Sequence, residues 1–498
     1  MAERIAFINP PSPQPGTIYI RDVNRSGRRS KERTIWPQTS LALMASVFQN
    51  DNVRIWDCIA ENIDYYNLYK QLQEFNPTWV IFNPISSTVT YDMIVSHFGK
   101  SLGAKTVSVS PHTKALREES LSRYKSLDYA VDYTKGGNEP EYQLRELING
   151  ISANGTSFEQ LPPARQDLLP IHKYSLPFIG KGYTFVVTSR GCPWACIYCR
   201  APVMNERKVR FRPVETVIEE IRRYNLQNIA FHADTATMNR KWIYDFCDAV
   251  EKLPFKVRIV TNSRVDTVDQ DMLYRMKASG FWMICYGVES GNDEVLRMNK
   301  KEATVEKARQ AVRMAKRAGL RVWGYFMLGM FGDTRNTIDE TIRLSQSESF
   351  DIVNFAISAP YPGTEWGRIA ETNGWLVDTR WEAYDQNYSA QVSQPDCSIE
   401  LVKEMQKKAY LQWYFSPRGL KFLASSFKPE YITYFLKTVR DHMEDYMKNE
   451  KKNKRNVSNN SKKSEFSEPK TMLDAFKNPI DSSNVNNLIN PISPLNIL

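Results

Sequence analysis

Long apolar runs are missing from this chain of 498 residues. No stretch reaches the roughly 18 apolar residues that a membrane-spanning helix needs. The opening MAERIAFINPP also lacks the longer apolar segment and the small-residue cleavage site of a secretory signal. We therefore expect a cytoplasmic protein without a transmembrane segment.

Cysteine is scarce, and its number is odd, with seven residues in the whole chain. Both facts argue against a disulfide framework and for a reducing compartment. Three of the cysteines crowd into one short segment, which makes them candidates for metal-binding thiolates. The others are scattered and are interpreted as small buried apolar residues: Cys58, Cys247, Cys285 and Cys397.

A strong excess of one charge is absent as well. The formal net charge is +10, and part of the excess lies in the tail after Met447. This modest balance implies no nucleic-acid partner, although it is compatible with a loose peripheral association with an anionic membrane. The tail, residues 448–498, is rich in Asn, Ser and Lys and is predicted to be disordered and basic.

Residues 1–150 alternate short apolar runs with helical patterns. Strands are predicted at residues 5–9, 53–57, 79–83 and 106–110. This rhythm predicts a Rossmann-like α/β domain, in which helices cover both faces of a parallel sheet. Residues 151–180 are predicted to be a linker, and its proline-rich part, 161–177, is expected to lie over the surface.

A second α/β unit is predicted at residues 181–385. Strand candidates at 185–189, 228–234, 256–264, 282–289, 321–330 and 351–359 alternate with amphipathic helices. Six such units make most of a TIM-type barrel, a partial (β/α)6 barrel. Residues 386–447 are predicted to be a helical C-terminal domain.

The segment TSRGCPWACIYCRAP places Cys192, Cys196 and Cys199 on a loop directly after the first barrel strand. Barrel enzymes keep their chemistry at this end of the strands. Three thiolates can ligate three irons of a cubane cluster, which usually has four protein ligands. One iron is then open to a cofactor that carries an amino and a carboxylate group. A zinc site, which would need a fourth ligand, and chance clustering of structural cysteines are the alternatives.

The motif GCPWACIYC resembles the signature of the radical S-adenosylmethionine (SAM) superfamily, in which an aromatic residue precedes the last cysteine. The resemblance implies a [4Fe-4S] cluster on the three cysteines. Reduced by a ferredoxin- or flavodoxin-like donor, this cluster would cleave SAM to a 5′-deoxyadenosyl radical.

The resemblance extends to the cofactor contacts. It implies that Tyr198 packs against the adenine ring, that Asp234 accepts from the methionyl ammonium and that Glu289 reaches the ribose hydroxyls. Arg264 is a candidate partner for the cofactor carboxylate through a charge-assisted bond. Alternatives are an ordinary loop aromatic for Tyr198, and surface ion pairs or barrel filling for the charged residues. No residue is assigned as catalytic.

The opening IAFINPP and the later WPQTSLALMASVFQNDNVRIWDC are similar to the branch of this superfamily that carries a cobalamin-binding domain before the barrel. The chain lacks the D-x-H-x-x-G motif of many cobalamin modules, because neither His97 nor His112 has the required Asp and Gly. Ser110 and Pro111 stand where such domains often carry paired glycines. Cobalamin binding, a scaffold and a substrate cap all remain open as roles of this domain.

We hypothesise cobalamin-dependent methylation of an unactivated carbon. One alternative is radical cyclisation or carbon–carbon bond formation on a hydrophobic small molecule, such as a lipid or a tetrapyrrole-like compound. The other is a non-catalytic iron–sulfur protein. The segment AYLQWYFSPRGL resembles the C-terminal region of members that methylate or cyclise such molecules, and its aromatic residues either line a substrate cavity or belong to the core.

Overall fold

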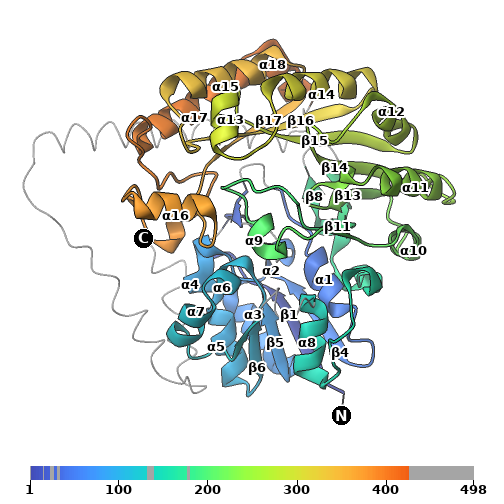
Figure 1. Cartoon of the computed structure of the whole chain (residues 1–498). Coiled ribbons are helices and arrows are strands. Elements are labelled where there is room, and N and C mark those ends of the chain that lie inside the picture. The colour runs from blue at the N-terminus through green and yellow to red at the C-terminus, as the bar shows by residue number, and fades with distance from the viewer. Residues whose placement is uncertain are drawn as a thin grey trace, which may run out of the picture.

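The computed structural model describes residues 2–14, 16–22, 27–30, 34–131, 139–176 and 180–425. Figure 1 shows an N-terminal sheet with its helices below a larger sheet whose helices form an outer layer. This arrangement confirms the predicted α/β fold class. The predicted helical residues 426–447 and the predicted disordered tail lie outside the described residues.

The N-terminal sheet is parallel and has the strand order β4-β1-β5-β6-β7. β1 pairs with β4 on one side and with β5 on the other, so the topological switch point lies at β1. The loops Asn9-Pro10-Pro11 and Asn83-Pro84 follow the two strands that meet there, where open α/β sheets bind ligands. The strands span Arg4–Asn9 (β1), Asn52–Asp57 (β4), Trp79–Phe82 (β5), Lys105–Ser108 (β6) and Tyr129–Ala130 (β7).

Helices cover both faces of this sheet because alternate residues of each strand point to opposite sides. Ile5 and Phe7 pack with residues of α1, whereas Ala6 and Ile8 pack with residues of α3 and α5. The result is the doubly wound, Rossmann-like domain that the apolar runs predict. The helices span Thr39–Ala45 (α1), Cys58–Glu61 (α2), Tyr65–Phe75 (α3), Val89–Asp92 (α4), Ile94–Ser101 (α5), Pro111–Ala115 (α6), Arg117–Arg123 (α7) and Pro140–Asn149 (α8).

A buried ion pair holds the loop at the switch point. Arg21 Nη2 lies 2.7 Å from Asp92 Oδ1, and both side chains are fully buried. The guanidinium also donates to the carbonyl oxygens of Pro10 at 2.9 Å and Pro11 at 3.1 Å. Because a buried charge is costly unless it is paired, Arg21 and Asp92 fix this loop as a unit.

Asp57, at the end of β4, is buried, and its burial should make the stability of the domain depend on pH. Its Oδ1 accepts from Asn9 Nδ2 at 2.7 Å and caps α2 at Ala60 N–H, but burial raises its pKa from 3.8 to about 6. The folded state therefore binds more protons than the unfolded state between these values, so this group makes stability fall as the pH rises through that window. We expect Asp57→Asn, which keeps both acceptor contacts, to raise the free energy of unfolding by about 1–3 kcal/mol near pH 7.5.

The gain from Asp57→Asn should be about half as large near pH 5, because the wild-type carboxyl is then largely protonated in the folded state. Urea unfolding at the two pH values measures both gains. A gain in unfolding free energy that does not depend on pH would contradict the raised pKa of Asp57.

The larger sheet is also parallel, with the order β10-β13-β14-β15-β16-β17. Six consecutive strands in sequence order confirm the predicted partial barrel. Each predicted strand is present with ends shifted by a few residues. The strands span Thr184–Val187 (β10), Asn228–His232 (β13), Arg258–Arg264 (β14), Phe281–Glu289 (β15), Arg321–Leu328 (β16) and Ile352–Ile357 (β17).

Helices follow these strands and bury their apolar faces on the outer side of the sheet (Figure 1). In α10, for example, Val217 and Ile221 are fully buried in this outer core. The helices span Ala201–Asn205 (α9), Val214–Arg223 (α10), Arg240–Val250 (α11), Gln270–Ala278 (α12), Asp293–Met298 (α13), Val305–Arg317 (α14), Arg335–Ser347 (α15), Glu365–Thr372 (α16), Ile399–Tyr414 (α17) and Pro417–Ser425 (α18).

Within 161–176 the proline-rich segment lies over the surface only in part, so that expectation was wrong for its buried residues. Leu161, Ala164 and Tyr174 are almost completely buried between the two sheets and join a core with residues of both. Gln166 donates to the carbonyl of Phe185 at 3.0 Å. The segment lacks a helical or strand period because short turns, rather than a regular element, place these apolar side chains. The domain boundaries themselves remain predictions.

The aromatic residues of α17 belong to the core and not to a cavity. Trp413 is buried in the outer core of the barrel, and Tyr410 and Tyr414 pack against that core. Phe415, just after the helix, is 68% exposed and belongs to neither. The core interpretation of this segment is therefore the better one. Within the described residues no helix is both long enough and apolar enough to span a bilayer.

Candidate active site

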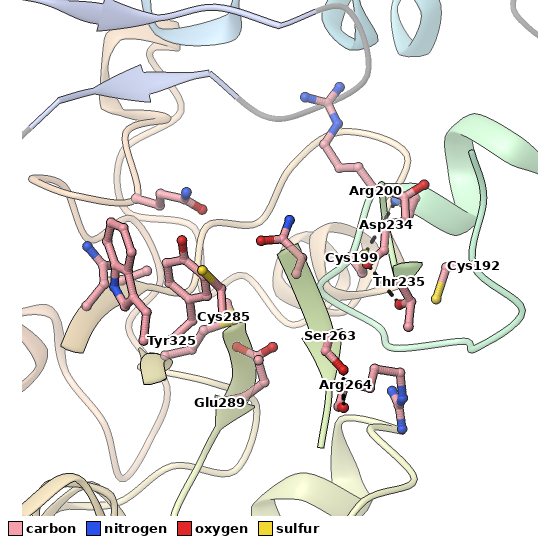
Figure 2. A pocket seen from close by; sticks show the side chains of 18 of the residues that line it. Cys192, Cys199, Arg200, Asp234, Thr235, Ser263, Arg264, Cys285, Glu289 and Tyr325 are labelled. Carbon is pink, nitrogen blue, oxygen red and sulfur yellow. Dashed lines mark hydrogen bonds between the residues drawn. The ribbon is translucent and has the colours of Figure 1, made fainter. Parts of the chain in front are cut away.

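One cavity of about 410 Å³ lies where the carboxyl ends of the barrel strands face the N-terminal segment. Residues of both units line it, including Asp22 and Trp36 from the N-terminal segment and Trp323 and Tyr325 from β16. Figure 2 shows part of this lining around the cysteines. All seven residues that the sequence singled out line this one cavity: Cys192, Cys196, Tyr198, Cys199, Asp234, Arg264 and Glu289.

The cysteine loop leaves the barrel through a tight turn. The short strand β11 (Ser189–Arg190) pairs with β12 (Arg210–Phe211), and Gly191 follows with a φ of 91°. A Cβ on Gly191 would lie 1.7 Å from the carbonyl oxygen of Lys208, so only glycine fits there. The turn brings the three thiols to the cavity wall.

The three thiols fit a cubane cluster by their chemistry. All are free and at least partly buried, and burial raises the pKa values of Cys192 and Cys199. Iron binding would therefore have to displace protons from these thiols, which a metal readily does. Among the described residues no three His, Cys, Asp or Glu side chains are grouped around one metal ion. In a cubane cluster each thiolate would instead reach its own iron.

Tyr198 lies between the second and third cysteines and packs on a small apolar cluster that includes Ile197, Trp366 and Val392. Burial raises its pKa well above the usual value of 10.0, so it stays neutral. The loop is tied to the barrel on both sides, because Ile197 N–H donates to Asn299 O at 3.2 Å and Trp366 N–H donates to Ile197 O at 2.9 Å. The ring is thus held at the cavity wall.

Asp234, two residues beyond β13, contacts the cysteine loop directly. Its Oδ2 accepts from the Gly191 N–H at 2.8 Å. Figure 2 places the carboxylate beside Cys199 and Thr235. Asp234 therefore has a structural task at the turn, and the cofactor contact expected for it remains a prediction.

Arg264 ends β14 and is more fully occupied than the sequence suggested. Its guanidinium forms a two-point pair with Asp266 at 2.8 Å and donates to Lys301 O at 2.7 Å. The same group lies 4.0 Å from the centre of the Trp194 ring, in the cysteine loop. Because stacking and pairing preorganise a guanidinium, Arg264 supports the loop whether or not it also binds a carboxylate.

Glu289 ends β15 with a φ of 70°, directly after an irregularity in the strand register. Its Oε1 accepts from Lys301 Nζ at 3.0 Å, and both groups line the cavity. A Cβ at Gly287 would lie 2.6 Å from that oxygen and 3.2 Å from Lys301 Nζ. Gly287 therefore makes the room for this pair. Burial lowers the pKa of Lys301, but the charge of Glu289 raises it. The pKa is raised on balance, and Lys301 stays protonated.

Sequence reasoning missed Lys301, although two consecutive lysines end the segment that contains Glu289, GVESGNDEVLRMNKK. The structure separates the two lysines. Lys301 points into the cavity, whereas Lys300 is exposed and pairs with Glu365 at 2.7 Å. The carboxylate of Glu289 and the ammonium of Lys301 together suit a ligand with both polar hydroxyls and charge.

We expect Lys301→Met to raise the Kd for SAM by about tenfold, a change of 1.4 kcal/mol, because it leaves Glu289 as an uncompensated charge in the cavity. Equilibrium dialysis with radiolabelled SAM on the anaerobically reconstituted protein measures the Kd. Lys300→Met, one residue away and exposed, is the matched control and should leave it unchanged. Equal Kd values for both variants would contradict the role of Lys301.

The N-terminal segment closes the cavity through a contact that spans 210 residues of sequence. His232 is the last residue of β13. Its Nε2 lies 2.7 Å from Asp22 Oδ2, and the two atoms form a hydrogen bond. The same carboxylate oxygen accepts from Trp36 Nε1 at 3.0 Å. No local signal in the sequence links these three residues, since their proximity depends on how the two units pack.

Residues 186–345 match the family model described as the radical SAM superfamily. This part of the barrel is a radical SAM domain. It is 26% identical to an uncharacterized methyltransferase of Pyrococcus horikoshii over 78% of this chain and 90% of that protein. An anaerobic magnesium-protoporphyrin IX monomethyl ester cyclase of Cereibacter sphaeroides is 29% identical over 35% of this chain and 30% of that protein. The match thus covers under a third of the length of the cyclase.

A solved structure has the same fold over most of the chain. It is the cobalamin-dependent S-adenosylmethionine radical enzyme OxsB with aqua-cobalamin and SAM bound, with a TM-score of 0.63 and 15% identity over 87% of this chain and 72% of that chain. This likeness supports the assignment of the fold, with an N-terminal Rossmann-like unit before the barrel. A [4Fe-4S] cluster and SAM are the cofactors of the superfamily whose model residues 186–345 match.

Proposed function

We propose that this radical SAM enzyme transfers a methyl group to an unactivated carbon of a small hydrophobic substrate, with cobalamin bound between its two units. The observation that carries the proposal is the cavity that residues of both units line, with the cysteine loop at its wall. A donor held by the N-terminal unit and a substrate held in the barrel would meet there. The sequence similarity to a methyltransferase over most of both chains supports methyl transfer.

The edge of the N-terminal sheet suits an amide-bearing ligand such as cobalamin. Asn9 Oδ1 and Asn83 Oδ1 are buried at the switch point and have no hydrogen-bond partner among the described residues. An orphaned buried acceptor is costly, and a ligand N–H would satisfy it. This is the fit that the fold leads us to expect at the carboxyl ends of β1 and β5.

No histidine lines the cavity among the described residues. His232 is bonded to Asp22, and His112 Nδ1 lies 3.1 Å from Ser86 Oγ. Cobalamin would therefore be held without a histidine on cobalt from this part of the chain, as the missing D-x-H-x-x-G motif predicts.

When bound, the cluster and SAM supply a 5′-deoxyadenosyl radical, and cobalamin supplies a methyl group. The residues of the chain position these reactants and exclude water. Cys192, Cys196 and Cys199 would hold the cluster, Tyr198 would flank the adenine, and Glu289 with Lys301 would bind the polar part of SAM. Asp234 and Arg264 keep the cysteine loop in place and would reach the amino acid end of SAM.

The barrel end of the cavity favours a hydrophobic substrate. Phe185, Trp323 and Tyr325 line it together with small apolar residues. Aromatic side chains offer large apolar contact at low entropic cost. A cyclisation or carbon–carbon bond formation on such a substrate, without methyl transfer, is the second candidate, and the similarity to a cyclase favours it.

Anaerobic reconstitution tests the proposal. We expect the reduced protein to hold iron and sulfide, to form 5′-deoxyadenosine from SAM, and to purify with bound cobalamin when the cells are supplied with it. Extracts of cells with and without the gene, fed with SAM labelled in the methyl group, would reveal a labelled lipid or pigment. Formation of 5′-deoxyadenosine without bound cobalamin and without labelled product would favour the second candidate.

A further inference from the structure

The loop after α9 has an unusual backbone beside the cysteine loop. Glu206 and Arg207 are consecutive, and their φ values are 48° and 60°. One left-handed residue is an ordinary way to end a helix. Two in succession, both with a Cβ, are unfavourable and persist only where the surrounding structure holds them.

This loop touches the cysteine loop on both sides of Cys192. Arg207 Nε donates to the carbonyl oxygen of Pro193, the residue after Cys192, at 2.7 Å. On the other side, Gly191 packs against the carbonyl oxygen of Lys208 so closely that no Cβ would fit. The left-handed backbone thus presents Arg207 to the turn that carries the first thiol.

We propose that Arg207 is a positioning residue for the iron–sulfur cluster, which holds the Cys192 turn through Pro193 and places its positive charge against that turn. A hydrogen bond to a ligand-bearing turn restricts the thiolate that the turn carries. A nearby positive charge stabilises the reduced, more negative state of a cluster and so raises its reduction potential. The side chain is exposed, so salt should weaken the charge effect.

An ordinary surface contact would affect neither the rate of iron loss nor the midpoint potential of the cluster. The single hydrogen bond of an exposed arginine adds little to folding stability, so its loss should leave the melting temperature of the metal-free protein almost unchanged. The rate of iron loss and the midpoint potential of the cluster, in contrast, report on the cluster itself.

The test compares Arg207→Ala with wild type on the anaerobically reconstituted full chain. We expect iron release to a chelator to become about tenfold faster, at the low end of the roughly 10–100-fold effects of outer partners of metal sites. We also expect the midpoint potential, followed by electron paramagnetic resonance, to become more negative. Arg207→Lys keeps the charge and should restore the potential, with iron release between the two.

Two controls separate the contact from its surroundings. Glu206→Gly relieves the left-handed strain without removing the guanidinium, so iron release should match wild type. Because it also removes a negative charge, its potential should not become more negative. The Lys208 side chain is 62% exposed. Lys208→Ala removes a charge next to Arg207 without breaking the bond from Arg207 to Pro193. Its potential should shift less than that of Arg207→Ala.

The proposal is overturned if Arg207→Ala releases iron at the wild-type rate with an unchanged potential, or if Lys208→Ala reproduces its effects. Wild-type protein that holds no iron would instead refute the cluster assignment itself. Normal iron in wild type with an unaffected Arg207→Ala refutes only the role of Arg207.

Discussion

Cys196→Ala should lose nearly all bound iron and sulfide after anaerobic reconstitution and form no detectable 5′-deoxyadenosine from SAM. Cys196 is buried in the middle of the loop, between the other two thiols in sequence. With two thiolates left, the cluster loses one of its three protein ligands. Iron and sulfide assays and chromatography of the reaction products measure both losses.

Cys247→Ala is the matched control for this variant. Cys247 is buried in α11 within the outer core and does not line the cavity. Its replacement should cost about 1 kcal/mol of stability, as a small core truncation does, and should leave the iron content at the wild-type level. If Cys196→Ala kept wild-type iron and activity, the cluster would have to be held elsewhere.

Asp92→Ala should lower the free energy of unfolding by about 3–5 kcal/mol, since it leaves the charge of Arg21 buried without its partner. Arg21 and Asp92 are both inaccessible to solvent, and the pair also fixes the Asn-Pro-Pro loop. The adjacent residue, Asp22, reaches His232 in the barrel, so the variant should also loosen the closure of the cavity. Urea unfolding measures the first effect.

Asp271→Asn provides the comparison for a removed carboxylate. Asp271 is exposed in the first turn of α12, and its replacement should change stability by no more than about 0.5 kcal/mol. Asp92→Asn should fall between the two, because the amide keeps hydrogen-bonding capacity but not the charge. A cost below about 1 kcal/mol for Asp92→Ala would mean that water reaches Arg21.

The barrel strands were predictable because parallel strands that are buried on both faces read as continuous apolar runs. In β15, for example, Phe281 to Tyr286 are all buried. Strands of two residues, such as β7 and β11, carry no period and were missed. The segment 161–177 was misplaced for a related reason, since buried turns without a period resemble a surface linker.

The cysteine spacing by itself predicts the chemistry proposed for the site, because three thiols at C-x-x-x-C-x-x-C after a strand suit a cluster with an open iron. The strand–helix rhythm determined the two α/β units, because hydrophobic periodicity is a local property. Only the tertiary structure decided that Lys301 pairs with Glu289, that Arg264 stacks on Trp194, and that Asp22 closes the cavity on His232. These contacts join residues that are distant in sequence or lie on different loops, and their formation depends on how the sheets pack.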